Sequence, residues 1–251
     1  MARLSTGRLE RMSDVVQLFC LPHSGATAQA YLRWTKLLPR SVEIQPVEPP
    51  GRGARTGEPL RTDLVGLASD LADELLPKVR ARYALFGHSL GAVLAFEIAH
   101  ALIERGAAAP MRLFVSASAA PALRDDRTKA KPLTDDELVD ELRRLRGTPE
   151  GALLDPELMA LVLPVLRADF LMAGGYRYRR RAPLPCPVAA LAGASDDVPA
   201  AAIGAWSSET ASGFAMKLFE GGHFFIHERE REALDFILDG LAAVTAGRAA
   251  A

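Results

Sequence analysis

The chain has 251 residues, of which 49% are hydrophobic, and its formal net charge at pH 7 is −1. This length fits one large α/β domain or two small ones, and the hydrophobic share is enough for a sizeable core. The near-zero charge excludes a bulk attraction to nucleic acid or to an anionic membrane. No apolar run approaches the roughly 20 residues that a membrane-spanning helix needs.

The chain ends and the cysteines favour a cytoplasmic protein. Residues 1–13 are basic and polar, and they lack the apolar stretch of a signal peptide. Cys20 and Cys186 lie in or beside apolar, strand-like segments, which predicts buried thiols rather than a disulfide framework or a metal site. We therefore expect a monomeric cytoplasmic protein without a bound metal, in which residues 1–13 and 246–251 are flexible.

Strands and helices alternate along most of the chain. Short apolar runs predict strands at residues 15–21, 42–47, 83–86, 111–117, 186–192 and 214–219. Helical spacing of apolar residues predicts helices near residues 28–38, 64–75, 92–104 and 234–241. This alternation predicts a single α/β domain over residues 14–245, with a mostly parallel central sheet and helices on both faces.

Residues 87–91, with the sequence Gly-His-Ser-Leu-Gly, follow one of these strands and open a helix. This G-x-S-x-G pattern between a strand and a helix is typical of the nucleophile of α/β-hydrolases. The tight turn exposes the hydroxyl of Ser89, while Gly87 and Gly91 leave space where strand and helix crowd together. The backbone N–H of Leu90 is a candidate donor to an oxyanion. The alternative is a turn that merely contains serine and glycine.

One long segment, residues 118–185, interrupts the alternation and shows only helix signals. Residues 134–137 form a capping box, and Asp155 followed by proline predicts a second helix start. We expect a helical lid here, as in other hydrolases of this type, with ordinary helical packing on the sheet as the alternative. The lid residues that are candidates for substrate contact are Leu166, Phe170 and Met172.

His223 is the candidate general base among the five histidines. It follows the last predicted strand, and the two glycines before it allow that loop to approach the nucleophile closely. Its place after the serine and the acid matches the chain order of an α/β-hydrolase triad. His88 lies within the elbow and His100 on the following helix, whereas His227 is expected at the surface.

The acid of the triad should follow the fifth predicted strand, where two aspartates are adjacent. In many hydrolases the acid lies three residues after the glycine that ends the strand, here Gly193, which favours Asp196. Asp197 remains the alternative. The acid orients the imidazole and stabilises its positive charge, and the other aspartate would cap the loop.

A second oxyanion donor is expected in the loop after the first strand. Residues 21–27 have the right position and contain the small residues that such a loop needs. The backbone N–H of Ser24 is the candidate donor beside that of Leu90. The alternative is a plain turn.

Several motifs together resemble the stand-alone type II thioesterases of polyketide and non-ribosomal peptide assembly lines. The matching segments lie at residues 22–26, 50–59, 87–91, 147–149, 163–170, 183–187 and 221–225, and the resemblance covers residues 18–241. One departure concerns the oxyanion loop, which usually reads Pro-aromatic-Ala-Gly-Gly and here reads Pro-His-Ser-Gly-Ala. A second concerns the acid loop, whose register varies within the family, so that both aspartates stay open.

The resemblance implies an α/β-hydrolase fold with a helical lid and an editing thioesterase. Such an enzyme removes stalled or aberrant acyl groups from the phosphopantetheine arm of acyl or peptidyl carrier proteins through an acyl-serine. It needs no cofactor of its own, because the substrate carries the phosphopantetheine. The alternative function is that of a general carboxylesterase or lipase acting on oxygen esters. A non-catalytic member of the fold would lack part of the triad, and no part is missing here.

Basic residues follow the lid helices and alternate with tyrosines. Arg177, Arg179, Arg180 and Arg181 form a candidate docking surface for an acidic carrier protein, with a solvated edge as the alternative. Arg52 and Arg55 are expected to hold loops near the elbow through hydrogen bonds to backbone groups or to Glu58.

Overall fold

A parallel sheet forms the centre of the protein. The computed structural model describes residues 15–124 and 131–249. The strands are β1 (Val16–Leu21), β2 (Val42–Pro46), β3 (Tyr83–His88), β4 (Leu113–Ser116), β5 (Val188–Gly193) and β6 (Phe214–Phe219). Within the described residues they form one six-stranded sheet in the order β2-β1-β3-β4-β5-β6, and all neighbouring strands are parallel.

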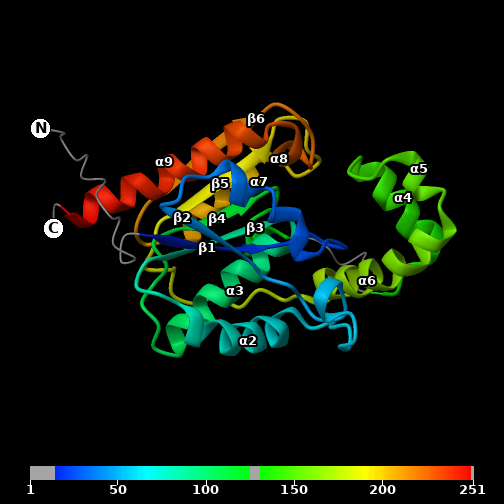
Figure 1. Ribbon diagram of the computed structural model, residues 1–251, viewed down its shortest axis with the longest axis horizontal. Helices are drawn as coiled ribbons and strands as arrows, with labels where there is room; N and C mark the ends of the chain where they lie inside the picture. The colour runs from blue at the N-terminus through cyan, green and yellow to red at the C-terminus, as the bar shows by residue number, and fades with distance from the viewer. Residues whose placement is uncertain (1–14, 125–130, 250–251) are drawn as a thin grey trace, which may run out of the picture.

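Helices cover both faces of this sheet (Figure 1). The α-helices are α1 (Trp34–Leu37), α2 (Leu64–Leu75), α3 (Leu90–Glu104), α4 (Asp135–Leu145), α5 (Glu150–Leu153), α6 (Pro156–Gly175), α7 (Ala200–Gly204), α8 (Phe225–Glu228) and α9 (Glu230–Ala249). Short 3₁₀ helices are η2 (Ala28–Tyr31), η3 (Gly53–Arg55), η4 (Leu76–Lys78), η5 (Pro121–Leu123) and η7 (Ala205–Glu209). In Figure 1, α2 and α3 lie below the sheet and α9 lies above it.

The two faces of the sheet bury separate apolar layers. Side chains of α2 and α3 pack on one face, where Phe96 of α3 contacts Trp206 edge to face at 5.4 Å. Side chains of α1 and α9 pack on the other face, together with Tyr31 and Trp34. Alternating strand residues therefore contribute to different layers, as expected for a parallel sheet that is covered on both sides.

The predicted strands and their parallel arrangement are confirmed, with shifts of a few residues at their ends. The helix predicted over residues 28–38 is instead divided into η2 and α1. Tyr31 ends η2 and Trp34 begins α1, and their rings contact each other edge to face at 4.9 Å. Both rings pack on Phe86 of the sheet, and the Tyr31 hydroxyl donates to Leu21 O at 3.0 Å.

The last helix is longer than the one predicted near residues 234–241. Helix α9 continues to Ala249, so residues 246–249 are helical. This stretch is rich in alanine, which has the highest helix propensity. Residues 1–13 and 250–251 lie outside the described residues.

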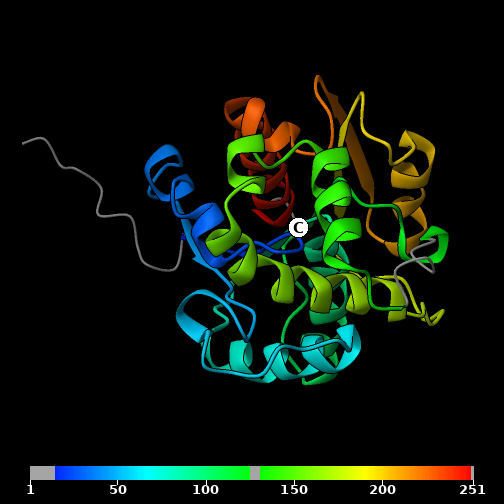
Figure 2. The ribbon, with the colours of Figure 1, turned by 90° about the vertical axis from the view of Figure 1, so that its right-hand side faces the viewer.

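Helices α4, α5 and α6 form the insertion between β4 and β5. They project beyond the sheet in Figure 1 and cross in front of it in Figure 2. The capping box at Thr134 is present, since its hydroxyl accepts from the Glu137 N–H and the Glu137 carboxylate accepts from the Thr134 N–H. The insertion has its own apolar cluster, made of Leu138, Leu153, Met159, Leu163, Leu166 and Phe170.

Helix α6 is longer and more apolar than the sequence analysis expected of any segment. It has 20 residues and is apolar enough to cross a membrane by length and composition alone, contrary to the sequence-based expectation. However, 56% of its most apolar window is buried inside the protein, and it carries the buried charge of Asp169. Its apolar surface therefore packs mainly against the rest of the chain.

Candidate active site

The predicted site residues lie in four loops at one edge of the sheet. Ser24, Ser89, Asp196 and His223 follow strands β1, β3, β5 and β6 respectively. The carboxyl ends of parallel strands share one edge, so these loops gather there although they are far apart in sequence. Strands β1 and β3 are neighbours, while β2 lies on the other side of β1. This point, where the strand order reverses, is where open α/β sheets bind their ligands.

The elbow holds Ser89 in a backbone conformation that is rare for residues other than glycine. Its φ is 56° and its ψ is −116°, and its N–H donates to Ser116 O at 2.8 Å. A Cβ on Gly87 would lie 2.0 Å from Gly91 O, and one on Gly91 would lie 2.3 Å from Leu21 O. Both glycines are thus required by close backbone approach, as the sequence predicted.

Of the two aspartates, Asp196 is the one that contacts His223. Its carboxylate oxygens lie 3.0 and 3.1 Å from His223 Nδ1, and the two side chains are 1% and 9% exposed. Asp197 is 67% exposed and pairs with Arg144 of α4. Because Nδ1 is bound to the carboxylate, Nε2 is left available to a hydroxyl.

Backbone contacts hold the acid and histidine loops together. The N–H of Ser195 donates to Gly221 O at 2.9 Å, and Gly221 has a φ of 117°. A Cβ on Gly193 would lie 2.3 Å from Gly222 O. Gly193 of the acid loop therefore allows the close approach of the histidine loop, whereas a Cβ on Gly222 would meet Ser195 O only at 3.9 Å.

A cluster of aromatic rings surrounds His223. The ring of His88 lies 5.2 Å from that of His223 and 5.7 Å from that of His23. Burial, followed by the neighbouring histidines, lowers the pKa of His23 to about 3 and that of His88 well below its usual value. His88 Nδ1 lies 2.9 Å from Ser116 Oγ. Both rings are therefore neutral near pH 7 and add no positive charge beside His223.

The remaining histidines lie where the sequence placed them. His100 is on α3 and packs edge to face on Phe96 at 4.7 Å. His227 is on α8, is exposed, and its ring stacks on that of Phe224.

The two residues predicted to supply the oxyanion donors border one cavity. Ser24 and Leu90 both line it, together with Ser89 and His223. Within residues 15–124 and 131–249, the N–H groups of Ser24 and Leu90 have no acceptor, whereas the next amide, Gly25 N–H, donates to Asp169 Oδ2 at 2.8 Å. These two backbone donors are thus available to an oxygen beside Ser89. No hydrogen bond joins the side chains of Ser89 and His223 in the described structure, and such pairs often tighten only when substrate binds.

This cavity has a volume of about 920 Å³ and lies between the catalytic loops and the insertion. Leu166 and Phe170 of α6 line it, as predicted. Met172 does not, because it lies on another side of α6, is 2% exposed, and packs in the core against the sheet. The α6 residues that face the cavity are Leu158, Met159, Val162, Leu166, Phe170 and Ala173, at the spacing of one helix face.

The basic run after α6 does not line this cavity. Arg181 does not fit the predicted docking role, because its guanidinium donates to buried Glu97 at 2.6 Å and lies over the Phe96 ring. Arg177 donates to the backbone oxygens of Gly174 and Tyr176. Arg179 and Arg180 are exposed, and their role in docking stays a prediction.

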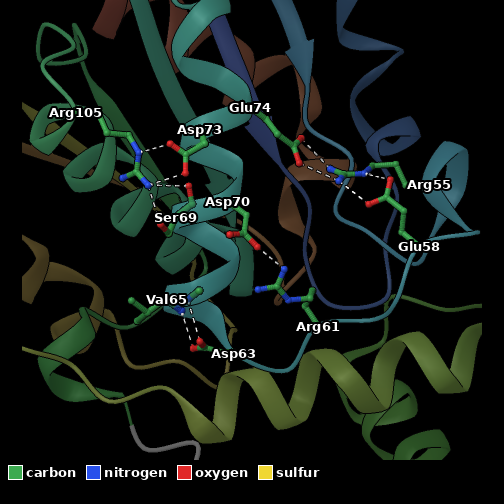
Figure 3. A network of polar contacts seen from close by, with 11 residues as sticks. Arg55, Glu58, Arg61, Asp63, Val65, Ser69, Asp70, Asp73, Glu74 and Arg105 are labelled. Carbon is green, nitrogen blue, oxygen red and sulfur yellow. Dashed lines mark hydrogen bonds and ion pairs between the residues drawn. The ribbon is translucent and has the colours of Figure 1, made fainter.

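Arg55 and Arg52 hold loops as predicted, and Arg52 has a further partner. Arg55 donates to both Glu58 oxygens at 2.7 Å and also pairs with Glu74 of α2 (Figure 3). Arg52 donates to the backbone oxygen of Ala26 at 3.5 Å, and it also forms a buried, bidentate pair with Asp169 of α6 at 2.6 and 2.7 Å. Sequence reasoning missed this pair. The signal that could have revealed it is a single acidic residue within the apolar stretch 158–173.

The cysteines and the acidic residues offer no metal site among the described residues. Cys20 and Cys186 are buried, as predicted, and neither forms a disulfide. In that part of the chain, no group of three or more His, Cys, Asp or Glu side chains could hold a metal ion.

Comparison with known proteins agrees with this geometry. A family model described as "Thioesterase domain" matches residues 16–241, which include all four catalytic loops and the insertion. The chain belongs to the thioesterase family. The match extends from the first residue of β1 to within α9.

Individual similar proteins indicate the type of thioesterase. This thioesterase is 35% identical to "Gramicidin S biosynthesis protein GrsT" from Aneurinibacillus migulanus, over 92% of this chain and 91% of the relative. It is 40% identical to "Thioesterase PikA5" from Streptomyces venezuelae, over 91% of this chain and 82% of the relative. Among solved structures, the type II thioesterase BorB from the borrelidin biosynthetic cluster has a TM-score of 0.82 at 38% identity, covering 90% of this chain and 93% of that one.

The resemblance found in the sequence is therefore confirmed, and this chain is a type II thioesterase with the α/β-hydrolase fold. The enzyme is a thioester hydrolase.

Proposed function

We propose that this thioesterase removes acyl groups from the phosphopantetheine arm of carrier proteins in a polyketide or non-ribosomal peptide assembly line. The observation that carries the proposal is the cavity in which Ser89, His223 and two free backbone N–H groups meet an apolar helix face. The similarity to proteins of gramicidin S and borrelidin biosynthesis supports the assembly-line setting. Editing of stalled or aberrant acyl groups is the role proposed for it, in the cytoplasm and as a monomer.

In the proposed mechanism Ser89 is the nucleophile and His223 the base. His223 Nε2 takes the hydroxyl proton as Ser89 Oγ attacks the thioester carbonyl, and Asp196 at Nδ1 stabilises the imidazolium. The N–H groups of Leu90 and Ser24 bind the oxyanion, and each such donor typically contributes about 3–4 kcal/mol. The C–S bond then breaks, and the pantetheine thiolate leaves with the proton held by His223.

Hydrolysis of the acyl-serine completes the cycle. His223 takes a proton from water, the resulting hydroxide attacks the ester carbonyl, and the same two N–H groups bind the second oxyanion. The proton returns to Ser89 Oγ as the C–O bond breaks, and the free acid leaves. Nucleophile, base and oxyanion donors all come from this chain, so we propose that the reaction needs no metal or cofactor.

The insertion is proposed to act as a lid that contacts the acyl chain. Leu166 and Phe170 supply apolar surface near Ser89, and Met159 extends it along α6. An apolar wall distinguishes substrates weakly, because one methylene changes binding by only about 1–3 kcal/mol. Such tolerance suits an enzyme that meets acyl groups of varied length.

The test compares kcat/KM for an acyl-carrier protein, the matched acyl-pantetheine and a matched oxygen ester. We expect the carrier-bound thioester to be the best substrate, because the proposed role requires recognition of the carrier. Ser89→Ala should lower kcat by at least about 10⁴-fold, since loss of a triad nucleophile leaves only the oxyanion and binding contributions. Ser207→Ala, at an exposed serine of η7, is the matched control and should leave the rate unchanged.

Two outcomes would contradict the proposal. Equal or better turnover of the oxygen ester would favour a general carboxylesterase, and turnover by Ser89→Ala would remove Ser89 as nucleophile. The double variant Arg179→Glu, Arg180→Glu tests the docking surface in the same assay. Full activity of that variant on carrier-bound substrate would exclude these two arginines from docking.

A further inference from the structure

A buried charged pair connects the insertion to the oxyanion loop. Asp169 of α6 accepts two hydrogen bonds from Arg52, at 2.6 and 2.7 Å, and one from the N–H of Gly25, at 2.8 Å. The side chains of Asp169 and Arg52 are only 2% and 5% exposed. Three chain segments that are distant in sequence therefore meet at one carboxylate, which binds the residue after Ser24.

Overall stability is a weak reason for such a pair. Removing two charges from water costs several kcal/mol per ion, and apolar residues of similar volume often stabilise a protein as well or better. Asp169 lies on a helix whose neighbouring side chains are mostly apolar. A role in fixing geometry explains the pair better than a contribution to the free energy of folding.

The hydrogen bonds of the oxyanion loop show what the pair fixes. Ala26 N–H donates to His23 O at 3.1 Å, and Gly25 N–H donates to Asp169. Arg52 Nη1 also lies 3.5 Å from Ala26 O. Both of the amides that follow Ser24 thus have acceptors within the protein, while Ser24 N–H is left for the oxyanion.

The turn at Gly25 makes this arrangement dependent on Asp169. Gly25 has a φ of 79°, a region in which glycine is equally free to take other conformations. Without an acceptor for its N–H, Gly25 can leave this conformation, and the chain on its N-terminal side, which includes the peptide that carries the Ser24 N–H, is then free to shift. Leu166 of α6 would contact a Cβ on Gly25 at 3.3 Å, so the same helix also limits the space around this turn.

We propose that Asp169 is a positioning residue for the oxyanion hole, acting through Gly25 and with the support of Arg52. The packing of α6 against the oxyanion loop then determines whether Ser24 N–H points at the reacting carbonyl. This inference rests on the proposed function in one respect, namely that the reaction passes through an oxyanion beside Ser89.

The test is Asp169→Asn, which keeps the size of the side chain and removes its charge and one acceptor. We expect kcat to fall about 100-fold, as for loss of one oxyanion donor, with KM changed by less than threefold. The affinity for an acyl trifluoromethyl ketone, which forms a tetrahedral adduct with the serine, should fall by a similar factor. The affinity for a non-reactive thioether analogue should stay the same, because it forms no oxyanion.

The matched control is Asp73→Asn. Asp73 of α2 also forms a bidentate pair with an arginine, Arg105, but on the surface and away from the cavity (Figure 3). It should leave kcat and the affinity for the ketone unchanged. Arg52→Lys keeps a positive charge beside Asp169 and leaves the Gly25 contact in place, so its kcat should fall much less than that of Asp169→Asn.

The proposal is overturned if Asp169→Asn folds and keeps its kcat and its affinity for the ketone, or if only KM changes. Should that variant fail to fold, amide hydrogen exchange in the native enzyme decides, because Gly25 N–H must exchange much more slowly than Ser24 N–H. Equal exchange rates would contradict the proposal. These measurements can use any thioester that the wild type hydrolyses. If the enzyme shows no preference for carrier-bound substrate, the test of Asp169 is still valid.

Discussion

At the scale of single residues, the two adjacent aspartates show how one position changes a role. Asp196 is buried against His223, while Asp197 is exposed and contacts the insertion. The loop turns just before Asp196, whose N–H donates to Gly193 O at 3.3 Å, and of the two carboxylates only that of Asp196 contacts the histidine. The spacing from Gly193 favoured Asp196 as the acid of the triad, but it left Asp197 as an alternative.

We predict that Asp196→Asn lowers kcat by about 10³–10⁴-fold, because the amide no longer holds the imidazole in the required tautomer. Asp197→Asn should change kcat by less than about fivefold, since an exposed ion pair contributes about 1 kcal/mol at most. Steady-state kinetics on one thioester measures both variants. A larger loss of kcat in Asp197→Asn than in Asp196→Asn would make Asp197 the acid of the triad.

At the scale of elements, the insertion contacts each of the catalytic loops that follow β1, β5 and β6. Helix α6 contacts the oxyanion loop through Asp169, and α4 contacts the acid loop through Arg144. Just after α4, a Cβ on Gly147 would lie 2.0 Å from the Phe224 ring, so this turn packs closely on the histidine loop. Movement of the insertion must therefore break contacts to the catalytic loops.

We predict that Arg144→Ala loosens α4 without unfolding the protein. The pair with Asp197 is about half exposed, so the free energy of unfolding should fall by less than about 1 kcal/mol. Amide hydrogen exchange over residues 135–145 should become faster, because α4 loses its contact with the acid loop. Arg143→Ala is the matched control, since Arg143 pairs with Asp140 and Glu150 inside the insertion. Equal acceleration in both variants would contradict the prediction.

At the scale of the whole molecule, buried neutral histidines make stability depend on pH. Burial is the main cause that lowers the pKa of His100 to about 4, with Arg181 adding to it, and that of His23 to about 3. In the unfolded chain these groups titrate near pH 6.5. As the pH falls below that value, the unfolded state binds protons that the folded state does not, so stability is lost.

We predict that the free energy of unfolding decreases from pH 6.5 to pH 5, with a slope of up to about 1.4 kcal/mol per pH unit for each such histidine. His100→Gln should reduce this slope by up to about 1.4 kcal/mol per pH unit, the contribution of one histidine. Above pH 7.5 the wild type and the variant should show the same slope. Urea denaturation at a series of pH values measures it. Parallel curves throughout would mean that His100 binds its proton equally in both states.

The sequence by itself determined those features that local patterns encode. Apolar periodicity predicted the strands and most helices, and the elbow at Ser89 and the capping box at Thr134 were visible because each depends on a few adjacent residues. His223 was found from its place after the last strand. The apolar length of α6 was underestimated from the sequence, since this helix could cross a membrane by length and composition alone although 56% of its most apolar window is buried inside the protein.

Tertiary structure alone decided which distant residues meet. Arg52 and Asp169 are 117 positions apart, and nothing local distinguishes their pairing from a solvated arginine and a helix carboxylate. The rotation of α6 decided that Leu166 and Phe170 line the cavity while Met172 lies in the core. Helical and extended patterns fix which residues share a face, but the partner of that face depends on the packing of the whole chain.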